Sequence, residues 1–463
     1  MVESAAVAVE VERYRAAGFD WKVRRGFRPG VDALCRALDD PGRLEGGVCV
    51  KANAARSVWR VALAGRTVYV KRYHVRGWRE RLKYRIVPPR AEAEWRAAVG
   101  LGEAGIEAVE PLAVGLAHRD GWLTDAFFVA AEAPGVPYSE FLAALRGDAE
   151  AVEALLRATV ALHERLRAAG VFHPDLHGGN MLGRLEGGEP RIALVDLHSI
   201  HRRRRVGRRA RRRMRAKLAH SLWRTLREDE FEYALRLLAP ADAVRLRLQV
   251  ERLERARLRS RSRRCMLHSS GFTHERAGDW KIWRRREVAA DALLALVARA
   301  PGDGNHTARL ATGDALRDVS VWRSTRRDWL PVWKGCHALG VRGIPTWHAY
   351  ACMRRRRFGL LREAILVVER EPGAVWFNFA VPVVREAALQ RAALDTAERL
   401  HRVGLAARPD ELFAVREESG WRVLRRAFRG AIPDRPVRAG RARRERERLR
   451  ALTAPDQSAT AER

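Results

Sequence analysis

The sequence predicts an α+β protein with two lobes, followed in tandem by a second, shorter and degenerate copy of the same design. Three observations lead to this prediction. Residues 68–73 alternate like a half-buried strand that carries a lysine. A polar loop at residues 173–180 precedes a short predicted hairpin. Residues 94–135 recur further along the chain at a constant offset of 238 positions.

The polar loop reads H-P-D-L-H-G-G-N over His173–Asn180, and Asp196 follows the predicted hairpin. A helix expected over residues 151–168 leads into this loop. An Asp five residues before an Asn, with a second Asp after the next hairpin, is the arrangement that phosphoryl transfer requires. The spacing therefore predicts Asp175 as the base for an acceptor hydroxyl, and Asn180 and Asp196 as metal ligands.

A lysine and a glutamate upstream complete the predicted site. Lys71 lies on the alternating strand, and Glu94 lies 23 residues later at the start of a helical pattern. Only seven of the 89 basic residues are lysines, so a lysine here indicates a position where arginine would not serve. We expect Lys71 to contact the phosphates with Glu94 holding it in place. Glu92 is the alternative partner if Glu94 faces away.

Two further segments would enclose a nucleotide, and only one of them has a recognisable sequence pattern. Phe127–Gly135 reads as a strand that runs into a hinge. Residues 51–60, where a glycine-rich phosphate loop is expected, contain no Gly-x-Gly pattern and only a turn of small and polar residues at 53–57. The phosphate loop is thus the weakest part of the predicted site.

Together, these motifs resemble the bacterial lipopolysaccharide core kinase family. The resemblance implies a protein-kinase-like fold, ATP and Mg²⁺ as cofactors, and an inner-core Kdo or heptose hydroxyl as acceptor. It also implies an anionic lipopolysaccharide or lipid A substrate and a cytoplasmic enzyme, peripheral at the inner face of the inner membrane. Asp196-Leu197-His198 replaces the D-F-G of protein kinases, which argues against a regulated activation loop.

The repeated segment lacks the residues that this chemistry needs. Trp322 takes the position of Lys71 and Val332 that of Glu94. Asp410 could correspond to Asp175, but no Asn follows at the right spacing, and we expected Arg425 where the second metal-binding Asp belongs. The second copy is therefore predicted to be a pseudokinase, with either a structural or a regulatory role.

These patterns divide the chain into five segments. They are a kinase-like N-lobe (1–136), a C-lobe with the catalytic loop (137–250), a basic linker (251–270), the degenerate kinase-like domain (271–435) and a basic, polar, disordered tail (436–463).

Composition and charge agree with this prediction. The formal net charge is +33, and the dense arginine run at 202–217 follows Asp196, where it would attract an anionic acceptor or an anionic membrane surface. Five scattered cysteines with no C-x-x-C pair argue for a reducing compartment. Nucleic acid is not expected as a partner, because no aromatic RNA-recognition motif or zinc-finger spacing is present.

Two alternative functions remain open at this stage. One is a Ser/Thr protein kinase or a small-molecule kinase on the same fold, because the catalytic residues would be the same. The other is a catalytically silent scaffold at the membrane surface, because the phosphate loop is poorly defined.

Overall fold

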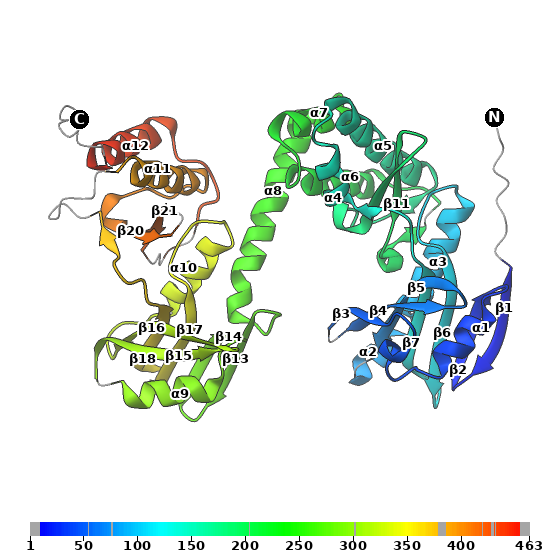
Figure 1. Ribbon diagram of the computed structural model, residues 1–463, viewed down its shortest axis with the longest axis horizontal. Helices are drawn as coiled ribbons and strands as arrows, with labels where there is room; N and C mark the ends of the chain where they lie inside the picture. Colours follow the sequence, from blue (N-terminus) through cyan, green and yellow to red (C-terminus); the bar gives the residue numbers. More distant parts are fainter. Residues whose placement is uncertain are drawn as a thin grey trace. The chain divides into compact units, whose positions relative to one another are not determined.

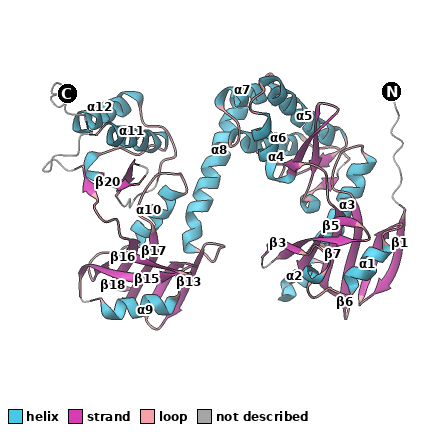
Figure 2. Ribbon diagram, viewed as in Figure 1, coloured by secondary structure: helices cyan, strands magenta, loops and turns pink. Residues whose placement is uncertain are grey.

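The computed structural model describes residues 10–453 apart from 54, 76, 203, 301, 378–385, 419, 427–429 and 431. The chain divides into two compact units, Met1–Leu253 and Glu254–Arg463 (Figure 1). Within each unit, sheet and helices are largely segregated (Figure 2). The α+β organisation expected from the sequence is confirmed. Among the described residues, no helix is both long and apolar enough to cross a bilayer.

An antiparallel sheet of seven strands, in the order β1-β2-β6-β7-β5-β4-β3, forms the first lobe of the first unit. Its strands are β1 (Val11–Ala16), β2 (Phe19–Arg24), β3 (Val48–Ala52), β4 (Arg56–Leu63), β5 (Arg66–His74), β6 (Pro111–Arg119) and β7 (Trp122–Ala131). A short 3-10 turn, η1 (Pro41–Arg43), precedes β3. The predicted strand at residues 68–73 is thus part of β5.

Both faces of this sheet are buried. Phe127 and Phe128 are adjacent on β7 and neither is exposed, because neighbouring strand residues point to opposite faces. Phe127 packs in the core that includes α1 (Arg28–Cys35), and Phe128 packs in the core that includes α3 (Arg90–Glu103). A short helix, α2 (Gly77–Lys83), connects β5 to α3 and buries none of its residues.

The second lobe of the first unit is mainly helical. It contains α4 (Tyr138–Leu145), α5 (Ala149–Ala168), α6 (Arg208–Trp223), α7 (Glu228–Leu238) and the start of α8 (Ala243–Ser262). Its short strands and turns are β8 (Val136–Pro137), β9 (Val171–Phe172), η2 (Gly178–Asn180), β10 (Met181–Glu186), β11 (Glu189–Leu194), η3 (Leu197–Ser199) and β12 (His201–Arg202). The predicted helix before the catalytic loop and the hairpin after it are confirmed as α5 and β10–β11.

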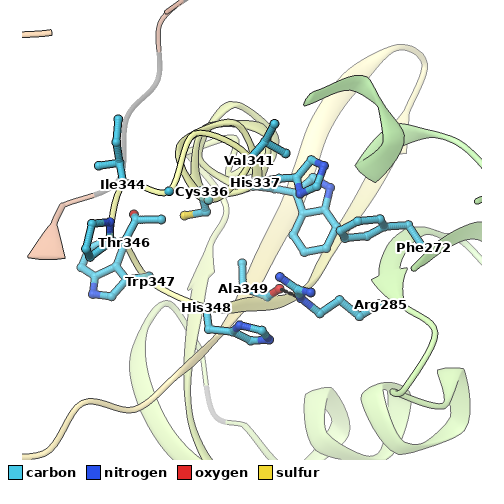
Figure 3. Close-up of a pocket in the computed structure, with 14 residues that line it drawn as sticks. Phe272, Arg285, Cys336, His337, Val341, Ile344, Thr346, Trp347, His348 and Ala349 are labelled. Atoms are coloured by element: carbon cyan, nitrogen blue, oxygen red, sulfur yellow. Dashed lines mark hydrogen bonds between the residues drawn. The ribbon is translucent and has the colours of Figure 1, made fainter. Parts of the chain in front are cut away.

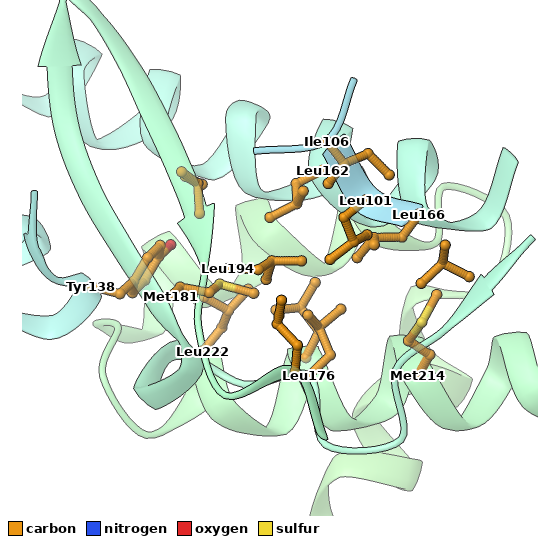
Figure 4. Packing of buried hydrophobic residues seen from close by; sticks show 14 of the residues in the cluster. Leu101, Ile106, Tyr138, Leu162, Leu166, Leu176, Met181, Leu194, Met214 and Leu222 are labelled. Carbon is orange, nitrogen blue, oxygen red and sulfur yellow. The ribbon is translucent and has the colours of Figure 1, made fainter. Parts of the chain in front are cut away.

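An apolar core supports the catalytic loop from behind (Figure 4). Leu176 of the loop and Leu194 of β11 are both fully buried there, beside Leu162 of α5. Asp148 caps the start of α5 by accepting a hydrogen bond from the N–H of Ala151 at 3.1 Å. The loop that carries Asp175 is therefore anchored by its buried apolar residues, while Asp175 itself is exposed.

The arginine run at 202–217 is part of an amphipathic helix. It enters α6, where Met214, Leu218 and Leu222 are buried on one face. Arg212 and Arg213 are exposed on the other. The basic linker expected at 251–270 is also largely helical, because α8 continues to Ser262 and a 3-10 turn, η4 (Arg263–Met266), follows.

The second unit has a six-stranded antiparallel sheet in the order β13-β14-β17-β18-β16-β15. The strands are β13 (Phe272–Ala277), β14 (Trp280–Arg285), β15 (Gly304–Thr312), β16 (Ala315–Ser324), β17 (Ala349–Arg357) and β18 (Leu360–Glu369), with α9 (Ala290–Arg299) and α10 (Leu330–Gly340) beside them. When β3 is left out of the count, this is the same order as β1-β2-β6-β7-β5-β4 in the first unit.

Short strands and two helices follow that sheet: β19 (Val375–Trp376), α11 (Ala387–Arg402), η5 (Pro409–Glu411), β20 (Leu412–Glu417), β21 (Gly420–Arg425) and α12 (Ala439–Thr453). The prediction of a disordered tail over residues 436–463 is wrong for α12. Ala442, Leu449 and Thr453 share one helical face and are buried, a pattern obscured by the arginines around them. Residues 454–463 lie outside the described part of the chain.

Candidate active site

Lys71 and Glu94 form an ion pair between β5 and α3. The side chain of Lys71 is 13% exposed and that of Glu94 is fully buried. The alternative partner, Glu92, faces elsewhere, since it pairs with Lys22 at 2.6 Å and with Arg96 at 2.8 Å. The structure thus places Glu94, and not Glu92, against the lysine.

Glu94 also connects the sheet to the segment that carries Asp196. Its carboxylate accepts hydrogen bonds from the hydroxyl of Tyr73 and from the backbone N–H of Leu197, the latter at 3.3 Å. Burial is the main reason that the pKa of Tyr73 is raised, and the charge of Glu94 adds to it. One buried carboxylate therefore sets the positions of the lysine and of the turn after Asp196.

Asp196 adopts a left-handed backbone conformation (φ 59°) between β11 and η3. Arg56 donates to both of its carboxylate oxygens at 2.8 Å, and Nδ1 of His198 lies 2.7 Å from one of them. Burial by itself would raise the pKa of Asp196, but the hydrogen bonds from His198 and Arg56, together with the charge of Lys71, hold it well below its usual range. Asp196 is thus an anion with a cation already bound.

The catalytic loop exposes Asp175 and buries His173, Leu176 and Asn180. The Asp175 side chain is 56% exposed, and Nε2 of His177 lies 3.4 Å from its carboxylate. His173 is fully buried and its ring Nδ1 accepts a hydrogen bond from the N–H of Asp175 at 3.3 Å. Burial lowers the pKa of His173 to about 4, so this ring is neutral near pH 7.

Hydrogen bonds link the segments that carry the predicted base, Asp175, and the two predicted metal ligands, Asn180 and Asp196. The side-chain amide of Asn180 donates to the carbonyl oxygen of Asp175 at 3.1 Å. The carbonyl of Asn180 accepts from the N–H of Val195, the residue before Asp196, at 3.0 Å. The charges of Asp175 and Asp196 both act on the ring of His173. The structure therefore brings Asp175, Asn180 and Asp196 together.

Arg56 is the residue of this site that the sequence did not reveal. It begins β4, directly after the small-residue turn at the position of the expected phosphate loop. The only available signal was an arginine in a segment with no glycines, and arginine is too common in this chain to be noticed.

Comparison with known proteins connects this geometry to a family. Residues 43–236 match the model of the Lipopolysaccharide kinase (Kdo/WaaP) family, and this segment contains all five predicted site residues. Over these residues, the first unit is similar to this family. The protein is accordingly a phosphotransferase with an alcohol group as acceptor.

The comparisons with individual proteins are more distant. A solved structure described as WaaP in complex with acyl carrier protein is 23% identical to the kinase, with a TM-score of 0.36, and the match covers 45% of this chain and 88% of that one. None of the curated proteins matches the chain.

The ligand set of the kinase suits Mg²⁺. Magnesium prefers carboxylate and amide oxygens and is held by one or two carboxylates plus substrate phosphates. Asp196 is ionised, and because the amide nitrogen of Asn180 bonds to Asp175, its amide oxygen is left for a metal. Lys71, itself in electrostatic contact with Asp196, would contact the phosphates.

A basic pocket of about 660 Å³ lies next to this site in the first unit. Its lining includes His198 and Arg202 after Asp196, and Lys83, Arg90 and Arg96 from the α2–α3 region. Several of the lining side chains are cationic, so the pocket suits an anionic ligand.

The sheet of the second unit carries a tryptophan at the position that pairs as Lys71 does. Trp322 pairs with Leu366 in the sheet, as Lys71 pairs with Phe128, and the offset between Phe128 and Leu366 is again 238. Its indole packs against Trp329 and Trp347, with ring centroids 5.4 and 4.4 Å apart. An aromatic cluster thus occupies the place of the lysine.

The hairpin β20–β21 shows that two residue correspondences expected from the sequence, those of Arg425 and Asp410, were wrong. Leu412 pairs with Arg425 as Met181 pairs with Leu194, so Arg425 corresponds to Leu194 and not to Asp196. By the same register, η5 corresponds to η2 and Asp410 corresponds to Gly179. The counterpart of Asp196 is Ala427, which lies outside the described residues. The sequence alone could not reveal this shift, because the loop before the hairpin differs in length between the units.

A further pocket of the second unit, about 500 Å³, lies beside α10 (Figure 3). Arg285 enters it above the ring of Phe272, with His337 and His348 nearby. Its lining contains no carboxylate, so this pocket does not resemble a metal–nucleotide site.

Proposed function

We propose that the protein transfers the γ-phosphate of ATP, with Mg²⁺, to a Kdo or heptose hydroxyl of the lipopolysaccharide inner core. The observation that carries the proposal is the meeting of the Lys71–Glu94 pair with Asp196 inside the segment that matches the family. Bound Mg²⁺ would neutralise the charge that develops on the phosphates.

Each residue has a distinct role in this proposal. Lys71 holds the phosphates, and Glu94 keeps its ammonium group in place. Asn180 and Asp196 hold the metal through their side-chain oxygens. Asp175 accepts the proton of the acceptor hydroxyl, and its exposure leaves it accessible to a large substrate. The basic pocket beside His198 supports an anionic acceptor.

Phosphate transfer with labelled ATP tests the acceptor. The full chain is incubated with purified lipid A–core, free Kdo, heptose and a generic protein acceptor, each with wild type and with Asp175→Asn. Label on the core saccharide that is lost in the variant is expected. Label on the protein acceptor alone would identify a protein kinase, and binding of ATP without transfer to any acceptor would favour a scaffold.

We further propose that the enzyme is cytoplasmic and binds the inner face of the inner membrane through the α2 segment. Trp78, Leu82 and Ile86 recur every fourth residue, and they are 68%, 46% and 83% exposed. Basic side chains surround them: Arg79, Arg81, Lys83, Arg85 and Arg90. Exposed apolar and cationic groups on one segment suit an anionic bilayer surface.

Vesicle flotation tests this surface. The wild-type chain is expected to float with vesicles that contain 30% phosphatidylglycerol and not with neutral ones. Replacing Trp78, Leu82 and Ile86 with serine should abolish flotation. The matched control replaces Leu185, Val244 and Leu316, which are 53%, 77% and 61% exposed, and should leave it unchanged. Equal flotation of both triple variants would contradict the proposal.

The second unit is proposed to be a kinase-like copy that does not bind nucleotide. The common strand order and the tryptophan at the lysine position support this. Titration calorimetry on the full chain should give one ATP·Mg site per chain, and Lys71→Ala should weaken it. A second site that survives in Lys71→Ala would contradict the proposal.

A further inference from the structure

Arg56 lies where the turn between β3 and β4 ends. Oδ1 of Asn53 accepts hydrogen bonds from the N–H groups of Ala55 and Arg56 at 2.9 and 3.0 Å, which makes a local turn without glycine. The turn ends at Arg56, the first residue of β4. The backbone position of this arginine is thus set by the segment where a phosphate loop was expected.

The Arg56 side chain reaches a residue 140 positions later. Its Nη1 and Nη2 each donate to a different oxygen of Asp196 at 2.8 Å. The two side chains are only 16% and 22% exposed, so solvent screens the pair weakly. This two-bond geometry is the strongest form of an arginine–carboxylate pair.

A divalent metal and this guanidinium compete for the same carboxylate. With both oxygens engaged by Arg56 and one also close to His198, a cation can coordinate both oxygens of Asp196 only if the arginine moves away. Charge repulsion between the two cations favours the same movement. Because the backbone of Arg56 is held by the hairpin, its guanidinium stays close to Asp196 after it is displaced.

Phosphate is the anion that would then be nearest. A metal held by Asp196 binds phosphate oxygens, and guanidinium binds phosphate through two parallel hydrogen bonds. We propose that Arg56 binds the phosphates of the nucleotide, and that its pair with Asp196 is the position it takes when no nucleotide is bound. Arg56 would supply the positive charge that backbone N–H groups of a glycine-rich loop supply elsewhere. The inference rests on the proposed use of ATP·Mg.

The proposal predicts that Arg56→Gln raises the affinity for Mn²⁺ and lowers the affinity for ATP·Mg. In Arg56→Gln, the carboxylate of Asp196 is freed, so Mn²⁺ should bind the nucleotide-free protein about tenfold more tightly, as measured by electron paramagnetic resonance. The same variant should bind ATP·Mg about tenfold more weakly by calorimetry, because a phosphate contact is lost. Arg56→Lys keeps the charge and should recover part of the ATP affinity.

Arg72→Gln is the matched control. Arg72 also pairs with a carboxylate, Asp125, at 2.6 Å, with side chains 24% and 17% exposed, but its guanidinium lies over Phe127 in the other core. The Arg72→Gln variant should bind both Mn²⁺ and ATP·Mg as the wild type does. Thermal unfolding of each variant checks that it is folded.

Two outcomes would overturn the proposal. If Arg56→Gln binds ATP·Mg as wild type does, Arg56 does not contact phosphate. If it binds Mn²⁺ more weakly than wild type, the pair supports the metal site and does not compete with it. Absence of ATP·Mg binding in the wild type would instead refute the proposed function, and the Mn²⁺ titration would still report whether Arg56 and metal compete.

Discussion

The carboxylate of Glu94 accepts a hydrogen bond from the backbone N–H of Leu197 at 3.3 Å. The same oxygen pairs with Lys71. Helix α3, strand β5 and the turn after Asp196 therefore share one fully buried carboxylate, so Lys71 and Asp196 cannot be positioned independently.

Glu94→Gln should lower both stability and turnover. Breaking a buried pair leaves an uncompensated ammonium and costs about 3–5 kcal/mol of unfolding free energy. Turnover should fall because Lys71 and Leu197 lose their common anchor. Urea unfolding and phosphate-transfer assays measure the two effects.

Glu92→Gln is the control for that experiment. Glu92 is equally well buried and pairs with Lys22 and Arg96, but it does not contact the site. It should lose stability and retain turnover. Equal loss of turnover in both variants would mean that Glu94 acts only through folding.

Asp175→Asn should reduce turnover by roughly 10²–10⁴-fold, because the acceptor hydroxyl loses its proton acceptor. Affinity for ATP·Mg should persist, since Asn180 and Asp196 remain. Asp410→Asn in the second unit is the control and should leave turnover unchanged. Normal turnover in Asp175→Asn would exclude it as the base.

His173 should make the protein sensitive to mild acid. Burial lowers its pKa to about 4, below the roughly 6.5 of an unfolded histidine. The unfolded state therefore binds protons first, and stability that is complete above pH 6.5 is lost as pH falls toward 4. The expected loss is about 2 kcal/mol between pH 7.5 and 5.

Urea unfolding at these two pH values measures that loss, with His173→Gln as the comparison. The variant should be less stable at pH 7.5, and its stability should change less between the two. The lowered pKa of Asp196 acts in a separate window, below about pH 4, where that carboxylate begins to lose its charge in the unfolded state. An unchanged pH dependence in the variant would show that another group is responsible.

Trp322→Ala should destabilise the second unit. Its ring packs against Trp329 and Trp347, so truncation should cost about 3 kcal/mol through lost contacts and a cavity. Calorimetric unfolding should show a lower transition temperature for one of two transitions. Stabilisation of the other transition by ATP·Mg should persist, and its loss would show that the units do not fold independently.

Features encoded by neighbouring residues could be predicted from the sequence. Asp175, Asn180 and Asp196 lie on one loop and the hairpin after it, so their spacing determines their relative positions. Helix α5 and strands β10 and β11 were predicted for the same reason: their periodicity and the glycines that end them are local properties.

The choice between Glu92 and Glu94 depended on long-range packing. The two residues lie in the first turns of one helix, and only the position of α3 against the sheet shows which one meets Lys71. The register of the second hairpin likewise became clear only from strand pairing. Helix α12 was missed because burial of three small or apolar residues outweighs an arginine-rich composition.

The sequence by itself determined the lysine, the carboxylates and the amide of the site, because their spacing is a property of short segments. Only the tertiary structure shows that Asp196 pairs with the guanidinium of Arg56. Arg56 and Asp196 are 140 residues apart, and no local pattern records a contact that exists only because the β3–β4 hairpin lies over the end of β11.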